Sequence, residues 1–280
     1  MKEWKVAFIG AGSMAEAMIS GMASSGTVRK ENIFAANRSN SLRLAELNRK
    51  YQINAVSLKD LPYEEMDAFI LAMKPKDAEK ALNALKGNIT RNQAVVSVMA
   101  GISTKFMEMN LHGGQQIIRA MPNTSSMIKE SATALSPSPS TSMENVWMAE
   151  ELMASIGSVF LIKEEQMDIF TGIAGSGPAY FYYLMESIEL TAEENGMDPG
   201  IARKAGAQTI LGAAKMMMSQ EESPAQLREN VTSPNGTTAA GLEALRFNGG
   251  GNAIAQAVLS AAERSKEMSE QIQEANLVKS

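Results

Sequence analysis

The clearest chemistry near the start of the chain lies in a glycine-rich turn. The apolar run Val6–Ile9 leads directly into the segment Gly10–Ala15, which reads Gly-Ala-Gly-Ser-Met-Ala, and then into a helical pattern. The two glycines permit a tight turn and a close approach of the backbone to a phosphate, and the helix start offers free N–H groups to an anion. A tight strand-to-helix turn in any α/β protein would give a similar pattern. The position directly after a strand favours a dinucleotide-binding turn.

The residues at the end of the second predicted strand decide which dinucleotide suits this turn. An NAD site usually carries an acid there for the ribose hydroxyl, but this chain has Asn37, Arg38 and Ser39. None of the three repels a phosphate, and the Arg38 guanidinium can bind one through its planar fork. A solvated surface charge is the alternative role of Arg38. We expect NADPH as the cofactor, with NADH as the second choice.

The glycine turn and residues 37–39 can meet only if a β-sheet brings them together. The first part of the chain has a sequence pattern typical of such a sheet. Short β-branched runs alternate with amphipathic stretches, which is typical of βαβ units around a parallel sheet. We predict strands at residues 4–9, 32–36, 67–72, 94–98, 116–119 and 159–162, and helices at 14–25 and 41–51. The Ser- and Pro-rich stretch 136–142 is interpreted as a surface loop within this domain.

After about residue 163 the strand signals stop and long helical patterns take over. We predict helices at residues 178–195, 198–220, 224–230, 238–247 and 254–273. Asp198 followed by Pro199 is a typical helix start, and Asn195 followed by Gly196 is a typical helix end. The sequence therefore predicts an α/β dinucleotide-binding domain over residues 1–163 and an all-α domain over residues 164–280.

Composition removes several other kinds of chemistry. The 280 residues include no cysteine and one histidine, His112, which excludes disulfides, thiolate or His-rich metal sites and a cysteine nucleophile. The formal charge is −5 and Lys and Arg are scattered along the chain, so the sequence shows no basic cluster of the kind that binds nucleic acid. No apolar run approaches the about 20 residues of a membrane span, and the first residues lack the pattern of a signal peptide. We expect a cytoplasmic protein without a metal, and we interpret His112 as an exposed loop residue.

Four further segments stand out along the chain: residues 69–75 (FILAMKP), 118–124 (IRAMPNT), 175–180 (GSGPAY) and 231–238 (VTSPNGTT). Together with the glycine turn, in this order and spacing, they resemble the Δ1-pyrroline-5-carboxylate reductase family. The resemblance implies NADPH-dependent reduction of the cyclic imine of pyrroline-5-carboxylate to L-proline, the last step of proline synthesis. It also implies a Rossmann domain followed by a helical dimerisation domain of the 6-phosphogluconate dehydrogenase type. Homodimers of the family intertwine, and some members assemble five dimers into a decamer.

The resemblance, with the phosphate argument above, also implies two sets of site residues. The cofactor-binding positions are Ile9, Gly10, Ala11, Gly12, Ser13, Met14, Asn37, Arg38, Ser39, Lys59, Ala72, Met73, Lys74, Pro75, Val98, Met99, Ala100 and Asn230. The substrate-binding positions are Glu164, Ser233, Gly236, Thr237 and Thr238. The resemblance places the Thr238 hydroxyl next to the imine nitrogen, as the catalytic group.

Two departures from the family pattern bear on these sites. Asn235 stands where the family usually has glycine, and asparagine tolerates the left-handed conformation better than other residues with a side chain. Lys59 stands where an asparagine commonly touches the adenosine ribose, and a lysine there would suit a phosphate. Since no arginine accompanies the last motif, we expect the substrate carboxylate to bind backbone N–H groups of the turn 235–238.

Several alternatives stay open at this point. Thr238 could instead be the N-cap of the helix that follows. The glycines of 175–178 suit either a substrate floor or a packed hinge, and Lys74 more readily lines the cofactor cleft than donates a proton. The β-hydroxyacid dehydrogenases use a lysine after a similar glycine motif, and its absence here favours an imine. A six-membered imine as substrate, or a non-enzymatic NADP-binding regulator, fits the same residues.

Overall fold

The computed structural model describes residues 3–277, with side chains as far as Ile272. The outer ends of the two predicted domains, residues 1–2 and 278–280, lie outside this range. The chain forms two compact units: one runs to Ser176 and resumes at Ser260, and the other comprises Gly177–Leu259. None of the helices within the described range is both long and apolar enough to span a bilayer.

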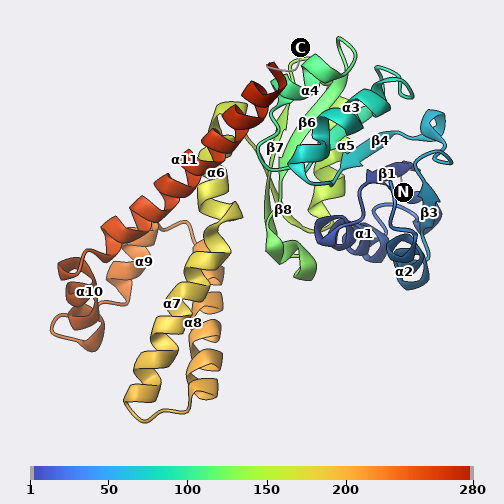
Figure 1. Ribbon diagram of the computed structural model, residues 1–280. Coiled ribbons are helices and arrows are strands. Elements are labelled where there is room, and N and C mark those ends of the chain that lie inside the picture. The colour runs from blue at the N-terminus through green and yellow to red at the C-terminus, as the bar shows by residue number, and fades with distance from the viewer. Residues whose placement is uncertain (1–2, 278–280) are drawn as a thin grey trace. The chain divides into compact units, whose positions relative to one another are not determined.

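The first unit is built on an eight-stranded sheet (Figure 1). Its strands are β1 (Val6–Ile9), β2 (Ile33–Asn37), β3 (Asn54–Ser57), β4 (Ala68–Leu71), β5 (Ala94–Ser97), β6 (Gln116–Met121), β7 (Ser131–Pro137) and β8 (Gly157–Leu161). The order across the sheet is β3-β2-β1-β4-β5-β6-β7-β8, and β1 to β6 are parallel. β7 is antiparallel to β6 and parallel to β8. The strand order reverses at β1, where open α/β sheets bind their ligands.

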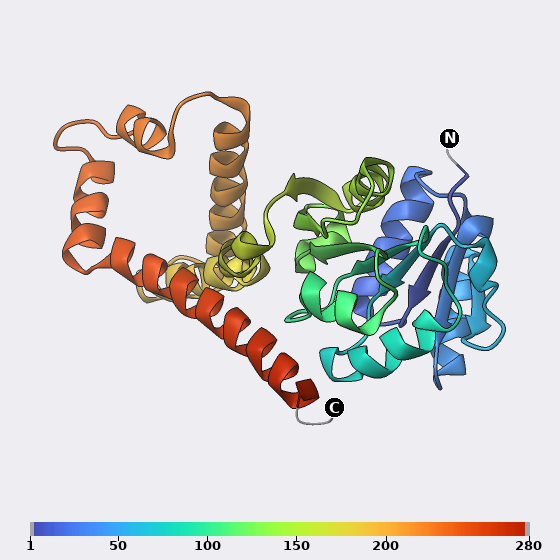
Figure 2. The same cartoon turned by 90° about the horizontal axis from the view of Figure 1, so that it is seen from above.

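Helices cover both faces of this sheet (Figures 1 and 2). They are α1 (Ser13–Ser25), α2 (Ser41–Tyr51), α3 (Ala78–Lys86), α4 (Thr104–Asn110) and α5 (Met143–Ala154), and the short helix α6 (Met167–Phe170) follows β8. One core includes the fully buried Met18 of α1, Leu47 of α2 and Leu152 of α5. The other includes Leu82 of α3 and Phe106 of α4. Because both faces are buried, the central strands are continuously apolar rather than alternating.

The second unit is entirely helical. It contains α7 (Gly177–Glu194), α8 (Pro199–Ser219), α9 (Pro224–Asn230), α10 (Thr237–Phe247) and the beginning of α11 (Gly250–Leu277). α7 and α8 lie side by side (Figure 1), joined by two hydrogen bonds of 2.7 Å from Arg203 to Glu189. The predicted start and end signals are confirmed, because the Asp198 side chain caps α8 and Gly196 after α7 has a φ of 83°.

The last part of α11 belongs to the first unit. The Ser265 hydroxyl donates to the Asp168 carboxylate at 2.7 Å. A Cβ on Gly101, which follows β5, would lie 3.2 Å from a methyl of Ile272. Ser265 and Ser269, one turn apart on α11, are buried. These small residues let the helix approach the loop after β5 closely.

Two strands of the first unit were not predicted, and one loop was misplaced. β3 and β7 were missed, whereas the other predicted strands and helices are present with small shifts at their ends. The stretch 136–142 is not simply a surface loop, because its first two residues end β7. Ser138 is buried and its N–H donates to the Ile117 carbonyl at 2.8 Å. The side-by-side pairing of β7 with β6 overrides the loop-like composition of this segment.

Candidate functional site

Loops that follow four parallel strands meet at one edge of the sheet, here called the carboxyl edge. The strands β1, β2, β4 and β5 all point toward it. The Gly10 N–H donates to the Ala36 carbonyl at 2.8 Å, and the Ala72 N–H donates to the Ile9 carbonyl at 3.0 Å. The structure therefore brings the predicted cofactor segments of the first unit together. These segments are residues 9–14, 37–39, 72–75 and 98–100.

The glycine turn has two distinct glycines. Gly10 has a φ of 111°, and a Cβ at this position would lie 2.5 Å from the Ala72 carbonyl oxygen. Gly12 is the N-cap of α1 with a φ of −77°, and a Cβ there would meet no described atom within 4 Å. No side chain caps this end of α1. The first N–H groups of the helix are therefore free to bind an anion, and the space beside Gly12 leaves room for it.

A cavity of about 310 Å³ opens beside this turn. Its lining residues are Ile9, Gly10, Asn37, Arg38, Ser39, Asn40, Leu58, Met73, Asp77, Lys80, Ala81 and Ala84. Six of them were predicted cofactor residues. Arg38 and Lys80 give the cavity two cations against the single carboxylate of Asp77. Lys80 was not predicted, because it lies on α3 and only the fold brings that helix to the end of β2.

Three of the predicted cofactor residues differ in their position: Asn37 lines this cavity, whereas Lys59 and Met99 do not. The Asn37 carboxamide oxygen accepts the N–H groups of Ser39 at 2.9 Å and Asn40 at 2.7 Å, and so shapes the turn that carries Arg38. Lys59 does not line the cavity that holds Arg38 and instead lines a neighbouring hollow of about 930 Å³. Leu58 lines both. Met99, the third, is buried in the core.

A charged cluster behind the glycine turn was also missed by the sequence analysis. The Arg43 Nε–H of α2 donates to the Ala11 carbonyl at 3.0 Å, and its guanidinium pairs with Glu16 of α1. The Lys50 ammonium and the Tyr51 hydroxyl donate to the other oxygen of Glu16, at 2.7 and 2.9 Å. Hydrogen bonds from Lys50, then Arg43, lower the pKa of Glu16 to about 2. The carboxylate is therefore ionised throughout the physiological pH range.

Glu164, predicted to lie on the substrate side, forms a partly buried ion pair in the first unit. One of its oxygens accepts from Arg119 Nη1 at 2.9 Å and from the Thr104 N–H, at the start of α4, at 3.3 Å. The Arg119 side chain is only 4% exposed. Its other two nitrogens, like the second oxygen of Glu164, have no partner among the described residues. Glu164 is thus the group that compensates the buried charge of Arg119.

The other predicted substrate residues lie in the second unit, on the turn before α10. Asn235 has a φ of 59°, which confirms that asparagine adopts the left-handed conformation in place of glycine. Gly236 is the N-cap of α10 and provides no side-chain cap, so the alternative role of Thr238 as N-cap is wrong. Thr238 is the second residue of the helix, and its side chain and that of Thr237 are exposed. Uncapped N–H groups and two hydroxyls therefore lie together at this helix end.

The remaining predicted residues are placed as follows. Asn230, also exposed, is the last residue of α9. Lys74 is exposed and directly precedes the short helix Pro75–Asp77. His112 lies in a loop, as predicted, but it is not exposed, because the ring is half-buried with its Nε2 2.8 Å from the Lys86 carbonyl oxygen. Within the described range, no three acidic or histidine residues group as a metal site would require.

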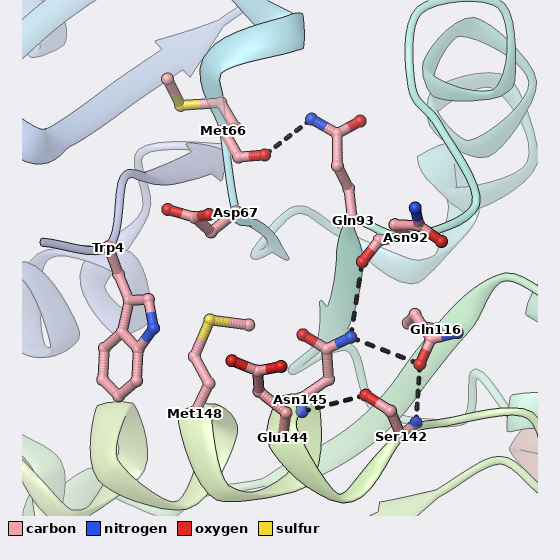
Figure 3. Close-up of a pocket in the computed structure, with 10 residues that line it drawn as sticks. All are labelled: Trp4, Met66, Asp67, Asn92, Gln93, Gln116, Ser142, Glu144, Asn145 and Met148. Atoms are coloured by element: carbon pink, nitrogen blue, oxygen red, sulfur yellow. Dashed lines mark hydrogen bonds between the residues drawn. The ribbon is translucent and has the colours of Figure 1, made fainter. Parts of the chain in front are cut away.

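A second hollow, of about 500 Å³, lies at the opposite edge of the sheet (Figure 3). Its lining includes Gln116, which begins β6, and Asp67, which directly precedes β4. The Ser142 N–H at the start of α5 donates to the Gln116 side chain at 2.6 Å, so the polar groups tie this helix to the sheet. None of the predicted site residues lines this hollow.

A largely parallel sheet covered on both faces, with a glycine turn at its reversal point and a cavity beside it, defines the class of dinucleotide-dependent oxidoreductases with a Rossmann domain. Comparison with known protein families places the chain more exactly within this class. Residues 5–101 match the family model described as NADP oxidoreductase coenzyme F420-dependent. Residues 164–268 match the model described as pyrroline-5-carboxylate reductase dimerisation.

Individual relatives agree over nearly the whole chain. Pyrroline-5-carboxylate reductase 1 of Bacillus spizizenii is 57% identical, over 96% of this chain and 91% of its own length. The structure of a pyrroline-5-carboxylate reductase from Coxiella burnetii has a TM-score of 0.89 at 31% identity, covering 96% of this chain and 99% of that one. Plasmodium falciparum pyrroline carboxylate reductase with NADP bound has a TM-score of 0.84 at 29% identity, covering 96% and 99%. The chain belongs to the pyrroline-5-carboxylate reductase family, which confirms the predicted family and fold class.

Proposed function

We propose that the protein reduces the cyclic imine of Δ1-pyrroline-5-carboxylate to L-proline with NADPH. The 57% identity to a pyrroline-5-carboxylate reductase over 96% of the chain carries this proposal. The free N–H groups at the N-terminal ends of α1 and α10 support it. A protonated imine is already a strong electrophile, so the reaction depends on orientation and exclusion of water more than on acid or base side chains.

The glycine turn and the cavity beside it fit NADPH. The open backbone at Gly12 and the uncapped N–H groups of α1 would hold the pyrophosphate. Arg38 and Lys80 would hold the 2′-phosphate, since both line the cavity at the end of β2. The cofactor bound there supplies the hydride, from its nicotinamide C4. The NADP in the Plasmodium falciparum relative supports the same choice of cofactor.

The turn before α10 supplies the proposed substrate contacts. The substrate carboxylate binds the free N–H groups at the start of α10, where the helix dipole favours an anion. The Thr238 oxygen accepts the N–H of the protonated imine and so orients the ring carbon for hydride transfer. Ser233, Gly236 and Thr237 complete this contact surface. Glu164 stays a prediction for the substrate side, because one of its oxygens is already engaged by Arg119 and Thr104.

The two halves of the chain are proposed to divide these tasks. Residues 1–163 would bind the cofactor, and residues 164–280 would bind the substrate and form a homodimer. The match of residues 164–268 to a dimerisation model supports the dimer. Large apolar side chains on α7 and α8, among them Phe181, Ile188 and Met217, are about half exposed in the single chain, as in a surface that a partner covers. Decamer assembly and a cytoplasmic location stay predictions.

The decisive test is oxidation of NADPH by the purified protein with pyrroline-5-carboxylate, followed by the loss of NADPH absorbance. We expect turnover that requires the imine and is more efficient with NADPH than with NADH. The six-membered imine carboxylate, assayed in parallel, shows how far the substrate range extends. Binding of NADPH without turnover would contradict the enzymatic proposal and favour a regulatory NADP-binding protein.

A further inference from the structure

The glycine turn is held from behind by a side chain that lies 32 residues further along the chain. Each nitrogen of the Arg43 guanidinium has a partner. Nε donates to the Ala11 carbonyl at 3.0 Å, Nη1 donates to Glu46 at 2.8 Å, and Nη2 pairs with Glu16. All three guanidinium nitrogens therefore bind protein atoms, and we assign Arg43 no direct contact with a phosphate.

The bond to Ala11 fixes the direction of one particular peptide group. In a trans peptide the carbonyl and the following N–H point in opposite directions within one plane. The carbonyl of Ala11 and the N–H of Gly12 belong to the same peptide, so a donor behind the carbonyl aims the N–H outward. Gly12 on one side of this peptide, and Gly10 one residue before it, leave the backbone here unusually free to rotate. Arg43 therefore restricts the rotation of the backbone that the two glycines allow.

The partners of Glu16 reduce the repulsion between its carboxylate and an anion bound at the same end of α1. Glu16 lies in the first turn of α1, where the N–H groups are available to an anion. Its carboxylate is bonded to Arg43 and Lys50, and these two cations balance its charge. The side chain is 21% exposed and that of Arg43 is 20% exposed, so both are held against the protein. Glu16 thus anchors the guanidinium without leaving an unpaired negative charge beside the turn.

We propose that Arg43 is a positioning residue for cofactor binding, which holds the Ala11–Gly12 peptide with its N–H directed at the pyrophosphate. The inference rests on the proposed function, because it assumes that the glycine turn receives the cofactor. It assigns Arg43 a role that differs from that of Arg38. The pyrophosphate is common to NADPH and NADH, whereas the 2′-phosphate occurs in NADPH alone. Loss of Arg43 should weaken both cofactors equally, and loss of Arg38 should weaken NADPH alone.

The test measures the Kd of NADPH and of NADH, by fluorescence titration, for the full-length wild type and its variants. We expect Arg43→Met to raise both Kd values by the same factor, roughly tenfold, which corresponds to one hydrogen bond of a charged group. Arg43→Lys keeps the charge but cannot reach Glu16 and Ala11 together, and should raise both Kd values almost as much. Arg38→Met is the matched control and should raise the Kd of NADPH alone.

Two further measurements separate positioning from a loss of folding. The kcat at saturating NADPH should stay near the wild-type value in the Arg43 variants, whereas misfolding would lower kcat and leave the Kd of the folded fraction unchanged. Glu16→Gln retains Arg43 but loosens its anchor, and should raise both Kd values by a smaller factor.

The outcomes are distinct. A rise in the Kd of NADPH alone in Arg43→Met, unchanged affinities, or full affinity in Arg43→Lys would each overturn the inference. A wild type that binds neither dinucleotide would refute the proposed function, and the inference with it.

Discussion

The two glycines of the turn serve different purposes, and replacing each with alanine separates folding from cofactor binding. At Gly10 the φ is 111°, and an alanine Cβ would lie 2.5 Å from the oxygen and 2.8 Å from the carbon of the Ala72 carbonyl. These are backbone atoms and cannot swing aside like the end of a side chain. A left-handed backbone costs an L-residue about 1–2 kcal/mol, and overlap with packed atoms costs about 1–3 kcal/mol. We expect Gly10→Ala to lower the free energy of unfolding by roughly 3 kcal/mol.

Gly12 should behave in the opposite way. Its φ is −77°, and a Cβ would meet no described atom within 4 Å. Gly12→Ala should therefore change the free energy of unfolding by less than about 0.5 kcal/mol. The methyl group would instead occupy the space through which the pyrophosphate approaches. An overlap costing about 1–3 kcal/mol corresponds to a rise of roughly 10- to 100-fold in the Kd of NADPH.

Chemical unfolding at one protein concentration and titration of NADPH fluorescence measure both effects. Gly113→Ala is the matched control, because this loop glycine also has no described atom within 4 Å of its Cβ position and lies outside the site. It should change neither quantity. Unchanged NADPH affinity in Gly12→Ala would refute the assignment of the turn to the pyrophosphate. Wild-type stability in Gly10→Ala would refute the steric argument.

Three further predictions concern the substrate turn, the charged cluster and the assembly. Thr238→Ala should lower kcat/KM for pyrroline-5-carboxylate roughly 100-fold while the Kd of NADPH stays unchanged; Thr238→Ser should restore most of the loss, and full activity of the alanine variant would contradict the assignment. Glu16 has its pKa lowered from 4.5 to about 2, so its contribution to stability is present above pH 4.5 and declines as the pH falls toward 2. After allowance for solvent screening, Glu16→Gln should cost roughly 2 kcal/mol at neutral pH and less at pH 3 in urea unfolding, and an equal cost at both pH values would refute this reasoning. Analytical ultracentrifugation should show a dimer or a larger assembly, and a monomer would contradict the proposed role of the helical unit.

Local signals in the sequence were sufficient where the structure depends on local chemistry. The helix at residues 41–51 and the cap at Asp198 were predicted correctly, because the hydrophobic spacing and the capping residue lie within the element itself. β7 was missed because it reads Ser-Ala-Thr-Ala-Leu-Ser-Pro, a composition typical of loops. Two of its hydroxyls bond to each other inside the protein, in the 3.0 Å contact between Ser131 and Thr133. Pairing with β6 on one side and β8 on the other makes this segment a strand.

The residues of the candidate site likewise form two groups, those that the sequence could predict and those that it could not. Gly10, Gly12 and Arg38 could be predicted because they belong to the loops that directly follow strands. Lys80 and Arg43 could not, because they lie inside helices, on faces whose neighbours depend on the packing of α3 and α2 against the sheet. No spacing in the sequence relates Arg43 to Ala11. A charged residue in an amphipathic helix ordinarily faces solvent, and the fold alone gives this one a backbone partner.

The attachment of the end of α11 to the first unit has a consequence for the synthesis of the protein. β1 leaves the ribosome before the second unit, whereas Ser265 and Ile272 leave it after the whole second unit. Until then, Gly101 and Asp168 lack the partners that α11 provides. A chain that ends before α11, or one cut to residues 1–163, therefore lacks the contacts that α11 makes with the first unit. Completion of the first unit therefore depends on residues that follow the whole second unit in the chain.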